Sequence, residues 1–386
     1  MTTSAPRVFF YVQHLLGIGH LRRAAAIAGA LVEAGAAVDF VLGGAPVAGI
    51  SPEGARVVQL PPAIASDAQF TDLLDAHGNK VDEAWKAQRK QALLAAFADA
   101  RADIVLLEMY PFGRRQFRFE LLPLLDATAK QRPKPLVAVS VRDILVDKGR
   151  MDRAREAAEI VKAHVDRVLV HGDPRLVRFE LTFPLAADIA DRLVYTGFVV
   201  ERPLASSAAQ DRSEGEILVS AGGGAVGFPL LSAAIRAKRL TRHRDRRWRV
   251  VTGGSLPEAE RRELAKLAAA DPDIAIDKFR ADFGTLLSTC HLSVSQGGYN
   301  TVMELIATRC PSVVVPFAEG GESEQTLRAR MLMQRQVLSM VDPEILTAGT
   351  LAAAIDAARP PAALELNLEG ARQSATDLIA AWKARA

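Results

Sequence analysis

The chain has 386 residues, of which 49% are hydrophobic and 24% are charged, and its formal net charge is +3. This composition is typical of a globular protein with buried cores, and the length suits two domains better than one. A net charge this small for the size gives no indication of a nucleic acid as a partner. The chain contains no uninterrupted run of about 18 apolar residues, so the sequence predicts no transmembrane helix.

The N-terminal segment is predicted to be part of the folded protein. Its apolar run is broken by Gln13 and His14 and lacks a small-residue cleavage site, so we expect no signal peptide. We therefore expect a cytoplasmic protein, with peripheral contact at the inner face of the membrane left open. The two cysteines, Cys290 and Cys310, form neither a disulfide framework nor a zinc-binding spacing, and are predicted to be small buried hydrophobic residues.

The first half of the chain alternates short β-rich runs with helical patterns. In residues 21–35 and 82–100, apolar side chains recur every three or four positions, which is typical of amphipathic helices. This alternation predicts βαβ units and a parallel sheet. Strands are predicted at residues 7–13, 37–44, 55–60, 102–110, 135–143 and 166–172.

The second half repeats the pattern after a change in composition. Between residues 199 and 215, Pro, Ser, Ala and charged residues replace the apolar runs, which indicates a linker. The linker separates an N-terminal domain, residues 1–198, from a C-terminal domain, residues 216–368. Residues 369–386 are predicted to form a terminal helix that could pack back on the N-terminal domain. Strands of the second domain are predicted at residues 216–224, 247–254, 274–279, 292–298 and 311–317.

The predicted fold class is therefore α/β, with two doubly wound domains. Ligands of such sheets bind beyond the carboxyl ends of the strands. The segment at residues 293–317 is the most informative, because a predicted strand is followed by a Gln-Gly-Gly turn and a helix that opens with Tyr299, Asn300 and Thr301. Glycines and a helix N-terminus bring N–H groups to an anion, and Glu304 one turn later suits the hydroxyls of a ribose. An ordinary capped helix start is the alternative.

The next strand and loop extend this motif. Glu324 and Gln325 open another helix, where an acid and an amide could hold sugar hydroxyls. QGGYNTVME, followed by a strand ending in Pro and then by EQTLRA, resembles the donor signature of GT-B glycosyltransferases. It is similar to the HCGWNSxxE…DQ signature of plant glycosyltransferases and to the family 28 C-terminal domain of peptidoglycan N-acetylglucosaminyltransferases.

The resemblance implies a GT-B fold, in which two Rossmann-like domains face each other across a cleft, and a nucleotide sugar as the donor. It implies that Glu304 binds the ribose and that Glu324 and Gln325 bind the transferred sugar. Two positions depart from the plant signature, since Gln296 replaces a His and Glu324 replaces an Asp. The residues implied to contact the diphosphate are Gln296, Gly297, Gly298, Asn300 and Thr301.

Two further segments are assigned to the same donor site. IDKFRADFGTLL is similar to the base-binding stretch of the family, which implies that Phe279 and Arg280 flank the base. SAGGGAVG fits the dinucleotide pattern G-x-G-x-x-G, but a nicotinamide site also needs an acid that closes the second strand, and RWRVVTGG ends without one. We therefore interpret Gly222, Gly223 and Gly224 as a loop that faces the donor phosphates.

The first βα turn, HLLGIGHLRRA, places Gly19 and His20 at the start of a helix. A histidine there can take a proton near neutral pH, which transfer to a hydroxyl requires, whereas a lone histidine can also simply pack or cap. GIGHL resembles the loop of plant glycosyltransferases in which the histidine is the catalytic base, and Gly19 is assigned to donor binding. The same resemblance implies an acidic partner for the histidine, and Glu108 stands at the matching strand end.

Three more polar residues stand at strand ends of the first domain. His14 is the fallback base. Arg142 and Asp143 are predicted to contact the acceptor or the diphosphate, with an ordinary loop salt bridge as the alternative. In the second domain, residues 239–249 hold six arginines and a histidine, and this run is either a solvated surface loop or a contact for anionic lipid headgroups or RNA.

These features predict an inverting glycosyltransferase that moves a hexosyl group from a nucleotide sugar, with UDP favoured, to an acceptor hydroxyl. We expect no cofactor and no metal, because no Asp-x-Asp pair is suitably placed for Mn²⁺, and we expect no nucleic acid partner. The acceptor is left open among lipid, polysaccharide and small molecule, and a peripheral membrane contact is also left open. The alternatives are a UDP-sugar 2-epimerase, a nicotinamide-dependent oxidoreductase and a nucleotide-sugar-binding protein without catalysis.

Overall fold

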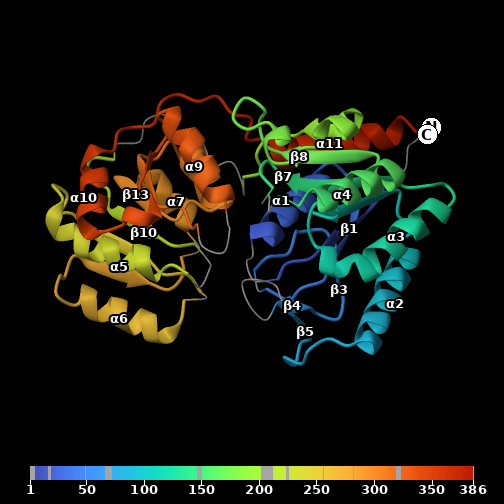
Figure 1. The fold of residues 1–386 in the computed structure, drawn as a ribbon, viewed down its shortest axis with the longest axis horizontal. Coiled ribbons are helices and arrows are strands. Elements are labelled where there is room, and N and C mark those ends of the chain that lie inside the picture. Colours follow the sequence, from blue (N-terminus) through green and yellow to red (C-terminus); the bar gives the residue numbers. More distant parts are fainter. Residues whose placement is uncertain are drawn as a thin grey trace. The chain divides into compact units, whose positions relative to one another are not determined.

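The structure is a computed structural model that describes residues 5–15, 19–47, 49–65, 72–145, 150–200, 212–222, 226–254, 256–280, 282–318 and 323–385. The chain divides into two compact units, each built on its own parallel sheet (Figure 1). The first unit comprises residues 1–201 together with residues 366–386, and the second comprises residues 202–365. The α/β fold class with two doubly wound domains is confirmed.

The first sheet has the strand order β3-β2-β1-β6-β7-β8-β9, and all its neighbouring strands are parallel. Its central strands are buried on both faces, as the continuous apolar runs predict. A separate antiparallel pair, β4 (Ile64–Ala65) and β5 (Leu73–Leu74), lies outside this sheet. The strands of the sheet are β1 (Arg7–Val12), β2 (Ala37–Leu42), β3 (Arg56–Gln59), β6 (Ile104–Glu108), β7 (Leu136–Arg142), β8 (Arg167–His171) and β9 (Leu193–Tyr195).

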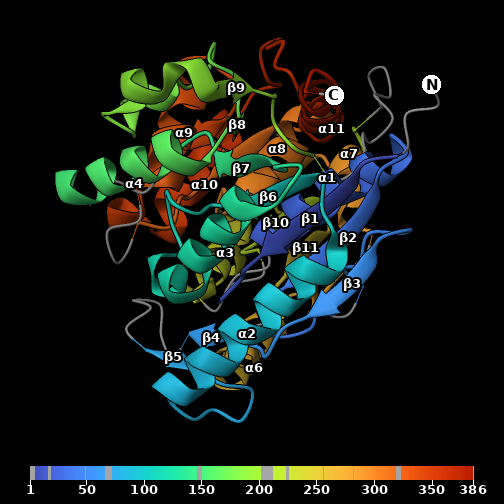
Figure 2. The same cartoon turned by 90° about the vertical axis from the view of Figure 1, so that its right-hand side faces the viewer.

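Helices cover both faces of the first sheet (Figure 2). Alternate residues of the strands point to opposite faces, so one set packs on α2, α3 and α4 and the other on α1 and α11. The C-terminal helix α11 contacts α1 and thus belongs to the first unit. The helices are α1 (Gly19–Glu33), α2 (Glu83–Ala100), α3 (Arg118–Lys130), α4 (Met151–His164) and α11 (Gly370–Lys383), with short 3-10 turns η1 (Arg115–Phe117), η2 (Phe179–Leu181) and η3 (Ala186–Arg192).

Helix α2 illustrates how the sequence defines these elements. Asp82 caps it, because its carboxylate accepts a hydrogen bond from the backbone N–H of Trp85 at 2.7 Å. Leu93 and Phe97, four positions apart, are buried against the sheet. The helix ends where Arg101 adopts a left-handed conformation.

The second sheet has the order β12-β11-β10-β13-β14-β15 and is parallel throughout. Its strands are β10 (Ile217–Ser220), β11 (Trp248–Val251), β12 (Ile274–Asp277), β13 (Leu292–Ser295), β14 (Ser312–Val314) and β15 (Ser339–Met340). The apolar residues of one face pack on α5 (Phe228–Ala237), α6 (Glu258–Ala268) and α10 (Ala348–Ala357). The remaining elements are α7 (Phe283–Thr289), α8 (Tyr299–Thr308), α9 (Glu324–Gln334), η4 (Lys238–Leu240) and η6 (Pro343–Ile345).

Each strand that the sequence predicts is present, though shorter at its ends, because the predicted ranges include the loop residues that follow each strand. Helix α1 begins two residues before the predicted start. The strands β4, β5, β9 and β15 were not predicted, since two or three residues are too few to show a two-residue period.

Both cysteines are buried, as predicted, with exposed fractions of 4% for Cys290 and 1% for Cys310. They precede β13 and β14, and their sulfur atoms lie 3.3 Å apart as free thiols. Within the described ranges, no helix has both the length and the apolar character that crossing a bilayer would need.

Candidate active site

Each sheet has a topological switch point, where the chain leaves neighbouring strands in opposite directions. In the first sheet this point lies between β1 and β6, and in the second between β10 and β13. Ligands of doubly wound folds bind at such points because the two loops diverge there and leave room. His20 follows β1 and Glu108 ends β6, whereas Gly222 follows β10 and the 296–298 turn follows β13. The predicted site residues therefore stand at these two positions.

The structure brings His20 and Glu108 together. The ring nitrogen Nδ1 of His20 lies 2.9 Å from Oε1 of Glu108, and the two side chains are 14% and 0% exposed. Arg23, one turn further along α1, forms an ion pair with the same carboxylate oxygen. A carboxylate can only accept a hydrogen bond, so Nδ1 carries the proton and Nε2 keeps its lone pair.

Burial and positive neighbours keep His20 neutral. Burial is the largest cause that lowers the pKa of His20 well below 6.5, and the guanidinium groups of Arg142, Arg114 and Arg23 lower that pKa further. His14 acts in the same direction. A neutral imidazole whose Nε2 carries no proton is the form that a general base needs.

Arg142 lies on the other side of the ring. Its guanidinium donates a hydrogen bond to Nε2 of His20 from the end of β7. Arg114 follows β6 and donates from Nε to the backbone oxygen of Gln13 at 2.7 Å, and burial lowers the pKa of Arg114 to about 10. The immediate surroundings of His20 thus hold the arginines at positions 23, 114 and 142 and one carboxylate, Glu108.

Asp143 follows Arg142 and is fully buried. A Cβ atom added at Gly172 would lie 2.5 Å from the Cβ atom of Asp143, so the glycine leaves room for that side chain. Asp143 is thereby part of the packed loop layer at the ends of β7 and β8. It differs in this from Arg142, whose side chain reaches the His20 ring.

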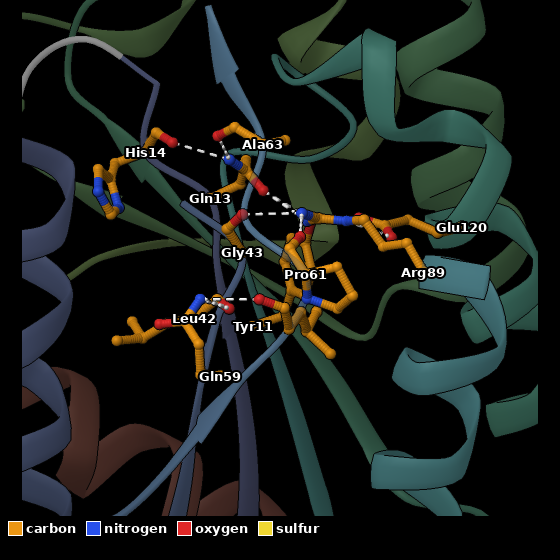
Figure 3. A network of polar contacts seen from close by, with 11 residues as sticks. Tyr11, Gln13, His14, Leu42, Gly43, Gln59, Pro61, Ala63, Arg89 and Glu120 are labelled. Atoms are coloured by element: carbon orange, nitrogen blue, oxygen red, sulfur yellow. Dashed lines mark hydrogen bonds and ion pairs between the residues drawn. The ribbon is translucent and has the colours of Figure 1, made fainter. Parts of the chain in front are cut away.

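A second polar network lies on the opposite face of the same sheet (Figure 3). The buried guanidinium of Arg89, on α2, contacts both carboxylate oxygens of Glu120, on α3, at 2.9 and 3.0 Å. It also donates to Oε1 of Gln13 at 2.6 Å, and the hydroxyl of Tyr11 donates to Glu120 at 2.6 Å. In turn the Gln13 amide donates to the backbone oxygen of His14 at 2.7 Å.

This network holds the end of β1, from which the chain continues toward His20. Sequence analysis missed it, because Arg89 and Glu120 stand in helical patterns that read as ordinary charged positions. The glycines after β2 were a usable signal. A Cβ atom at Gly43 would lie 2.1 Å from Oε1 of Gln13, and one at Gly44 would lie 2.5 Å from Cε1 of His14. Only glycine leaves these two side chains in place.

His14 is buried, with an exposed fraction of 5%. Burial lowers its pKa from the usual 6.5. Its ring packs over Gly44, and no hydrogen-bond partner of its Nδ1 atom is found in the part of the chain that the structure describes. Unlike His20, it has no carboxylate partner among those residues.

In the second unit, the 296–298 turn is built as the sequence predicts. Gly297 has φ +77°, and a Cβ atom there would lie 2.4 Å from Cγ1 of Val314. Gln296 donates from its amide to the backbone oxygen of Val226 at 3.1 Å and so links the loops after β13 and β10. Gly298 is the N-cap residue of α8 and supplies no side-chain cap, which leaves the first N–H groups of the helix for another acceptor.

Asn300, Thr301 and Glu304 follow on the first turns of α8, and all three are partly exposed. Gly222 adopts φ +71°, which favours glycine, while Gly223 and Gly224 lie outside the described residues. The three residues of α8 thus stand near the N-terminal end of one helix.

Two buried serines stand beside these loops. Ser220 and Ser295 are directly opposite each other at the ends of β10 and β13. Their exposed fractions are 2% and 1%, and neither hydroxyl has a hydrogen-bond partner among the described residues. Sequence analysis passed over both serines because they read as strand positions.

Glu324 and Gln325 are held by contacts within the protein. Glu324 is 2% exposed, and its Oε1 accepts a hydrogen bond from Arg328 at 2.9 Å. The guanidinium of Arg328 lies 5.1 Å from the ring centroid of Tyr299 and so joins α9 to α8. Oε1 of Gln325 accepts a hydrogen bond from the backbone N–H of Phe317 at 3.1 Å.

The predicted base-binding residues follow β12. Phe279 is 63% exposed, which is a high fraction for a large aromatic side chain. Arg280 forms hydrogen bonds of 2.8 and 2.6 Å with both carboxylate oxygens of Asp282. The two side chains therefore differ, one being open to a ligand and the other engaged on the protein surface.

The arginine-rich run at residues 239–249 is largely tied to the protein. Arg246 donates to the backbone oxygen of Ser213 at 2.5 Å, and Arg249 pairs with Glu216 and Asp277 at 2.7 Å each. These contacts tie Arg246 and Arg249 to the segment before β10 and to the end of β12. In the ranges that the structure describes, no group of three or more His, Cys, Asp or Glu side chains is arranged to hold a metal ion.

Comparison with known proteins agrees with this architecture. Residues 218–380 match the glycosyltransferase family 28 C-terminal domain. Across nearly its full length the chain also superposes on solved structures. The calicheamicin glycosyltransferase CalG4 gives a TM-score of 0.60 at 15% identity, covering 98% of this chain and 96% of that one. MurG from Acinetobacter baumannii gives 0.56 at 14% identity, covering 99% and 96%. The chain therefore has the GT-B fold of these glycosyltransferases.

Sequence relatives of this GT-B chain are named UDP-N-acetylglucosamine–N-acetylmuramyl-(pentapeptide) pyrophosphoryl-undecaprenol N-acetylglucosamine transferase. The protein from Granulibacter bethesdensis is 29% identical over 170 residues, which is 42% of this chain and 44% of that protein. The protein from Paramagnetospirillum magneticum is 27% identical over 173 residues, which is 44% and 47%. The chain thus spans less than half the length of these relatives.

A GT-B chain named as a UDP-N-acetylglucosamine 2-epimerase, from Listeria monocytogenes, is equally similar in fold. Its TM-score is 0.61 at 11% identity, covering 99% of this chain and 97% of that one. At such identities the similarity concerns the fold alone. The match to the family 28 domain spans the second unit from β10 onward and includes most of α11, which packs on the first unit.

Proposed function

We propose that this GT-B protein is an inverting glycosyltransferase, which transfers a hexosyl group from a nucleotide sugar to the hydroxyl of an acceptor. The main support is the pair of His20 and Glu108, with 2.9 Å between Nδ1 and Oε1, at the switch point of the first sheet. The match of the second unit to the family 28 C-terminal domain supports a nucleotide sugar, with UDP as the favoured nucleotide.

In the proposed reaction, Nε2 of His20 accepts the proton of the acceptor hydroxyl as its oxygen attacks the anomeric carbon. The bond from that carbon to the diphosphate oxygen breaks, and the nucleoside diphosphate leaves with the bonding electron pair. A single displacement of this kind inverts the configuration at the anomeric carbon. Glu108 keeps the Nδ1 proton in place and stabilises the imidazolium that forms.

Arg142 bears directly on this step, because its guanidinium occupies the hydrogen-bonding position at Nε2. We infer that the acceptor hydroxyl displaces this guanidinium when the acceptor binds. Before the acceptor binds, this cation lies against the ring and lowers the pKa of His20, which disfavours protonation of the ring. Arg142 would thus keep the base in its neutral form until it is used.

On the donor side, we propose that the diphosphate binds at the 296–298 turn and the N-terminus of α8. Backbone N–H groups and the helix dipole stabilise negative charge there and require no metal ion. Glu304 would bind the ribose hydroxyls, so Glu304→Ala should weaken the affinity for UDP measured by calorimetry. An unchanged affinity would remove Glu304 from the donor site.

The other residues assigned to donor binding differ in how exposed they are and in the contacts that they already make. Phe279 is exposed enough to stack on a base. Glu324 would have to exchange its contact with Arg328 for a sugar hydroxyl. We therefore assign the sugar first to Gln325, whose Oε1 accepts a hydrogen bond from the backbone N–H of Phe317 and whose amide nitrogen carries two donors. The acceptor stays open among lipid, polysaccharide and small molecule. The family match covers the second unit and most of α11 but not the rest of the first unit, to which we assign acceptor binding.

The deciding experiment compares His20→Ala with the unmodified protein. We expect the variant to bind UDP normally while kcat for transfer falls by about 10²–10⁴-fold, the usual contribution of a general base. Normal turnover would exclude His20 as the base. A chelator control should leave the rate of the unmodified protein unchanged, since no metal is invoked.

The 2-epimerase is kept as a second candidate because of the fold similarity described above. An epimerase converts its nucleotide sugar without any acceptor. Incubation with UDP-N-acetylglucosamine alone, followed by NMR of the sugar, therefore separates the two. Accumulation of a 2-epimer would favour the epimerase, whereas a donor that is stable until an acceptor is added would favour the transferase.

A further inference from the structure

A second histidine, His171, lies at the carboxyl end of β8 and is fully buried. It is connected to the His20–Glu108 pair through one side chain, Ser140 on β7. The Ser140 hydroxyl lies 2.7 Å from Oε2 of Glu108 and 2.8 Å from Nε2 of His171. Beyond β9, the hydroxyl of Thr196 lies 2.9 Å from Nδ1 of His171.

These side chains line the face of the sheet that carries α1. Glu108 and Ser140 are directly opposite each other in register, and each continues the alternation of residues that pack on α1. The contacts therefore step across β6, β7, β8 and the residue after β9, one strand at a time. The four side chains that this hydrogen-bond chain joins, those of Glu108, Ser140, His171 and Thr196, are all 0% exposed.

The number of available protons allows only one donor and acceptor order in this series of hydrogen bonds. Glu108 accepts on both oxygens, so the single hydroxyl proton of Ser140 points to Oε2. The Ser140 oxygen must then accept the proton on Nε2 of His171, and a neutral His171 has no proton left on Nδ1, which accepts from Thr196. If the Ser140 hydroxyl pointed to His171 instead, a lone pair of the Ser140 oxygen would face a lone pair of Oε2 of Glu108 across 2.7 Å.

We propose that Ser140 and His171 are positioning residues of the proposed reaction, which orient the Glu108 carboxylate and thereby fix the proton of His20 on Nδ1. This inference rests on the proposed function for its meaning, but the hydrogen-bond chain itself can be tested without turnover. The hydrogen bond from Ser140 holds Oε2, so Oε1 faces His20 in one orientation only. Both side chains are 0% exposed, so they are assigned to act through Glu108 and not by contact with a bound substrate.

Burial lowers the pKa of His171 well below 6.5, and the nearby cation of Arg23 lowers that pKa further, so His171 is neutral as the chain requires. His20 is faced by charged and titratable groups from every element around it. They are Arg23 on α1, Glu108 on β6, Arg114 after β6, Arg142 on β7 and His14 after β1. Ser140 acts only through Glu108.

The first test is NMR of the histidine ring nitrogens in the unmodified full-length protein at neutral pH. We expect His20 to carry its proton on Nδ1 and His171 on Nε2. In Ser140→Ala, Glu108 loses a donor, so its charge acts more strongly on His20. We expect the Nδ1 proton of His20 to shift and the pKa of His20 to rise. Ser140→Thr keeps the hydroxyl and should restore both signals.

Kinetics supplies the second readout. Ser140→Ala should lower kcat by about tenfold or more with little change in KM for the nucleotide sugar, and should move the acid limb of the pH profile to higher pH. Ser140→Thr should recover both. Thr196→Val serves as a second variant, because Thr196 is the last residue in this series of hydrogen bonds. It should change the same NMR signals in the same direction but by less.

The inference is overturned if His171 carries its proton on Nδ1, or if the His20 signals are the same in Ser140→Ala and in the unmodified protein. Failure of the proposed function shows itself differently, as normal transfer by His20→Ala. In that case the tautomers of both histidines still decide whether the hydrogen-bond chain exists.

Discussion

At the scale of single residues, the chemistry depends on which nitrogen of His20 carries the proton. The carboxylate of Glu108 decides this, because an acceptor at 2.9 Å from Nδ1 leaves Nε2 as the basic atom. Burial, and after it the guanidinium groups of Arg142 and Arg23, then keep the ring neutral by lowering its pKa. A lone histidine in a loop would have neither property.

Glu108→Gln should therefore lower kcat by about 10²–10⁴-fold, because the amide can donate to Nδ1 and leave the proton on Nε2. Glu108→Asp keeps an acceptor and is the matched control, with a smaller loss expected from its shorter reach. Steady-state kinetics with a saturating donor measures both. Equal activity of Glu108→Gln and the unmodified protein would contradict the assigned tautomer.

Arg142→Ala should move the acid limb of the pH profile upward, since removal of a nearby positive charge raises the pKa of His20. The measurement is kcat/KM between pH 5 and 8. Arg115→Ala changes an arginine that is exposed and paired with Glu156, and serves as the control. A limb that stays in place would show that Arg142 does not set the pKa of His20.

At the scale of elements, the start of α8 depends on the backbone of one turn. Gly297 is in the left-handed region and its α-hydrogen faces Val314, whereas Gly298 has φ −58° and open space around its Cα. Two adjacent glycines thus tolerate substitution very differently. The sequence alone does not distinguish these two glycines.

Gly297→Ala should destabilise the protein by about 1–3 kcal/mol and weaken UDP binding, because strain and overlap with Val314 displace the turn. Gly298→Ala should fold with nearly unchanged stability. Thermal melting and calorimetry with UDP measure the two effects. The same small effect for both variants would contradict the assigned backbone conformation.

The pair of Arg89 and Glu120 acts at the same scale, because it connects α2 and α3 to the end of β1. Removing one member of a buried ion pair leaves an uncompensated charge. Loss of either side chain should therefore destabilise the strand end from which the polypeptide runs to His20. This pair lies on the face opposite to the Ser140–His171 hydrogen bonds.

At the scale of the whole molecule, the buried histidines make folding sensitive to acid. His20 and His171 have lowered pKa values in the folded state, so below about pH 6.5 the unfolded chain binds protons that the folded chain excludes. Stability then falls as the pH falls, by about 1.4 kcal/mol per pH unit for each such group, until the folded-state pKa is reached. Above about pH 6.5 this effect vanishes.

The melting temperature should accordingly drop between pH 7.0 and pH 5.5, a range in which most exposed carboxylates remain ionised. Substituting His171 by Gln should make the drop smaller, because one of the titrating groups is gone. Differential scanning calorimetry at the two pH values provides the measurement. A constant melting temperature would contradict the neutral state assigned to these histidines.

Much of the fold could be predicted because its signals are local. The strand runs at residues 102–110 and 292–298 are apolar and bounded by turn residues, and GIGHL and QGGYN stand where such strands end. The short strands β9 and β15 could not be predicted, since their few residues take their conformation from the neighbouring strand.

The sequence by itself determined two doubly wound domains, the loops that hold His20 and Gln296, and the acid expected at position 108. Only the tertiary structure decided that Ser140 and His171 continue from Glu108, that Arg142 lies against the His20 ring, and that Glu324 is buried on Arg328. The reason is physical. A periodic pattern reports which face a side chain occupies on its own element, whereas hydrogen bonds across parallel strands join residues whose separation along the chain carries no pattern.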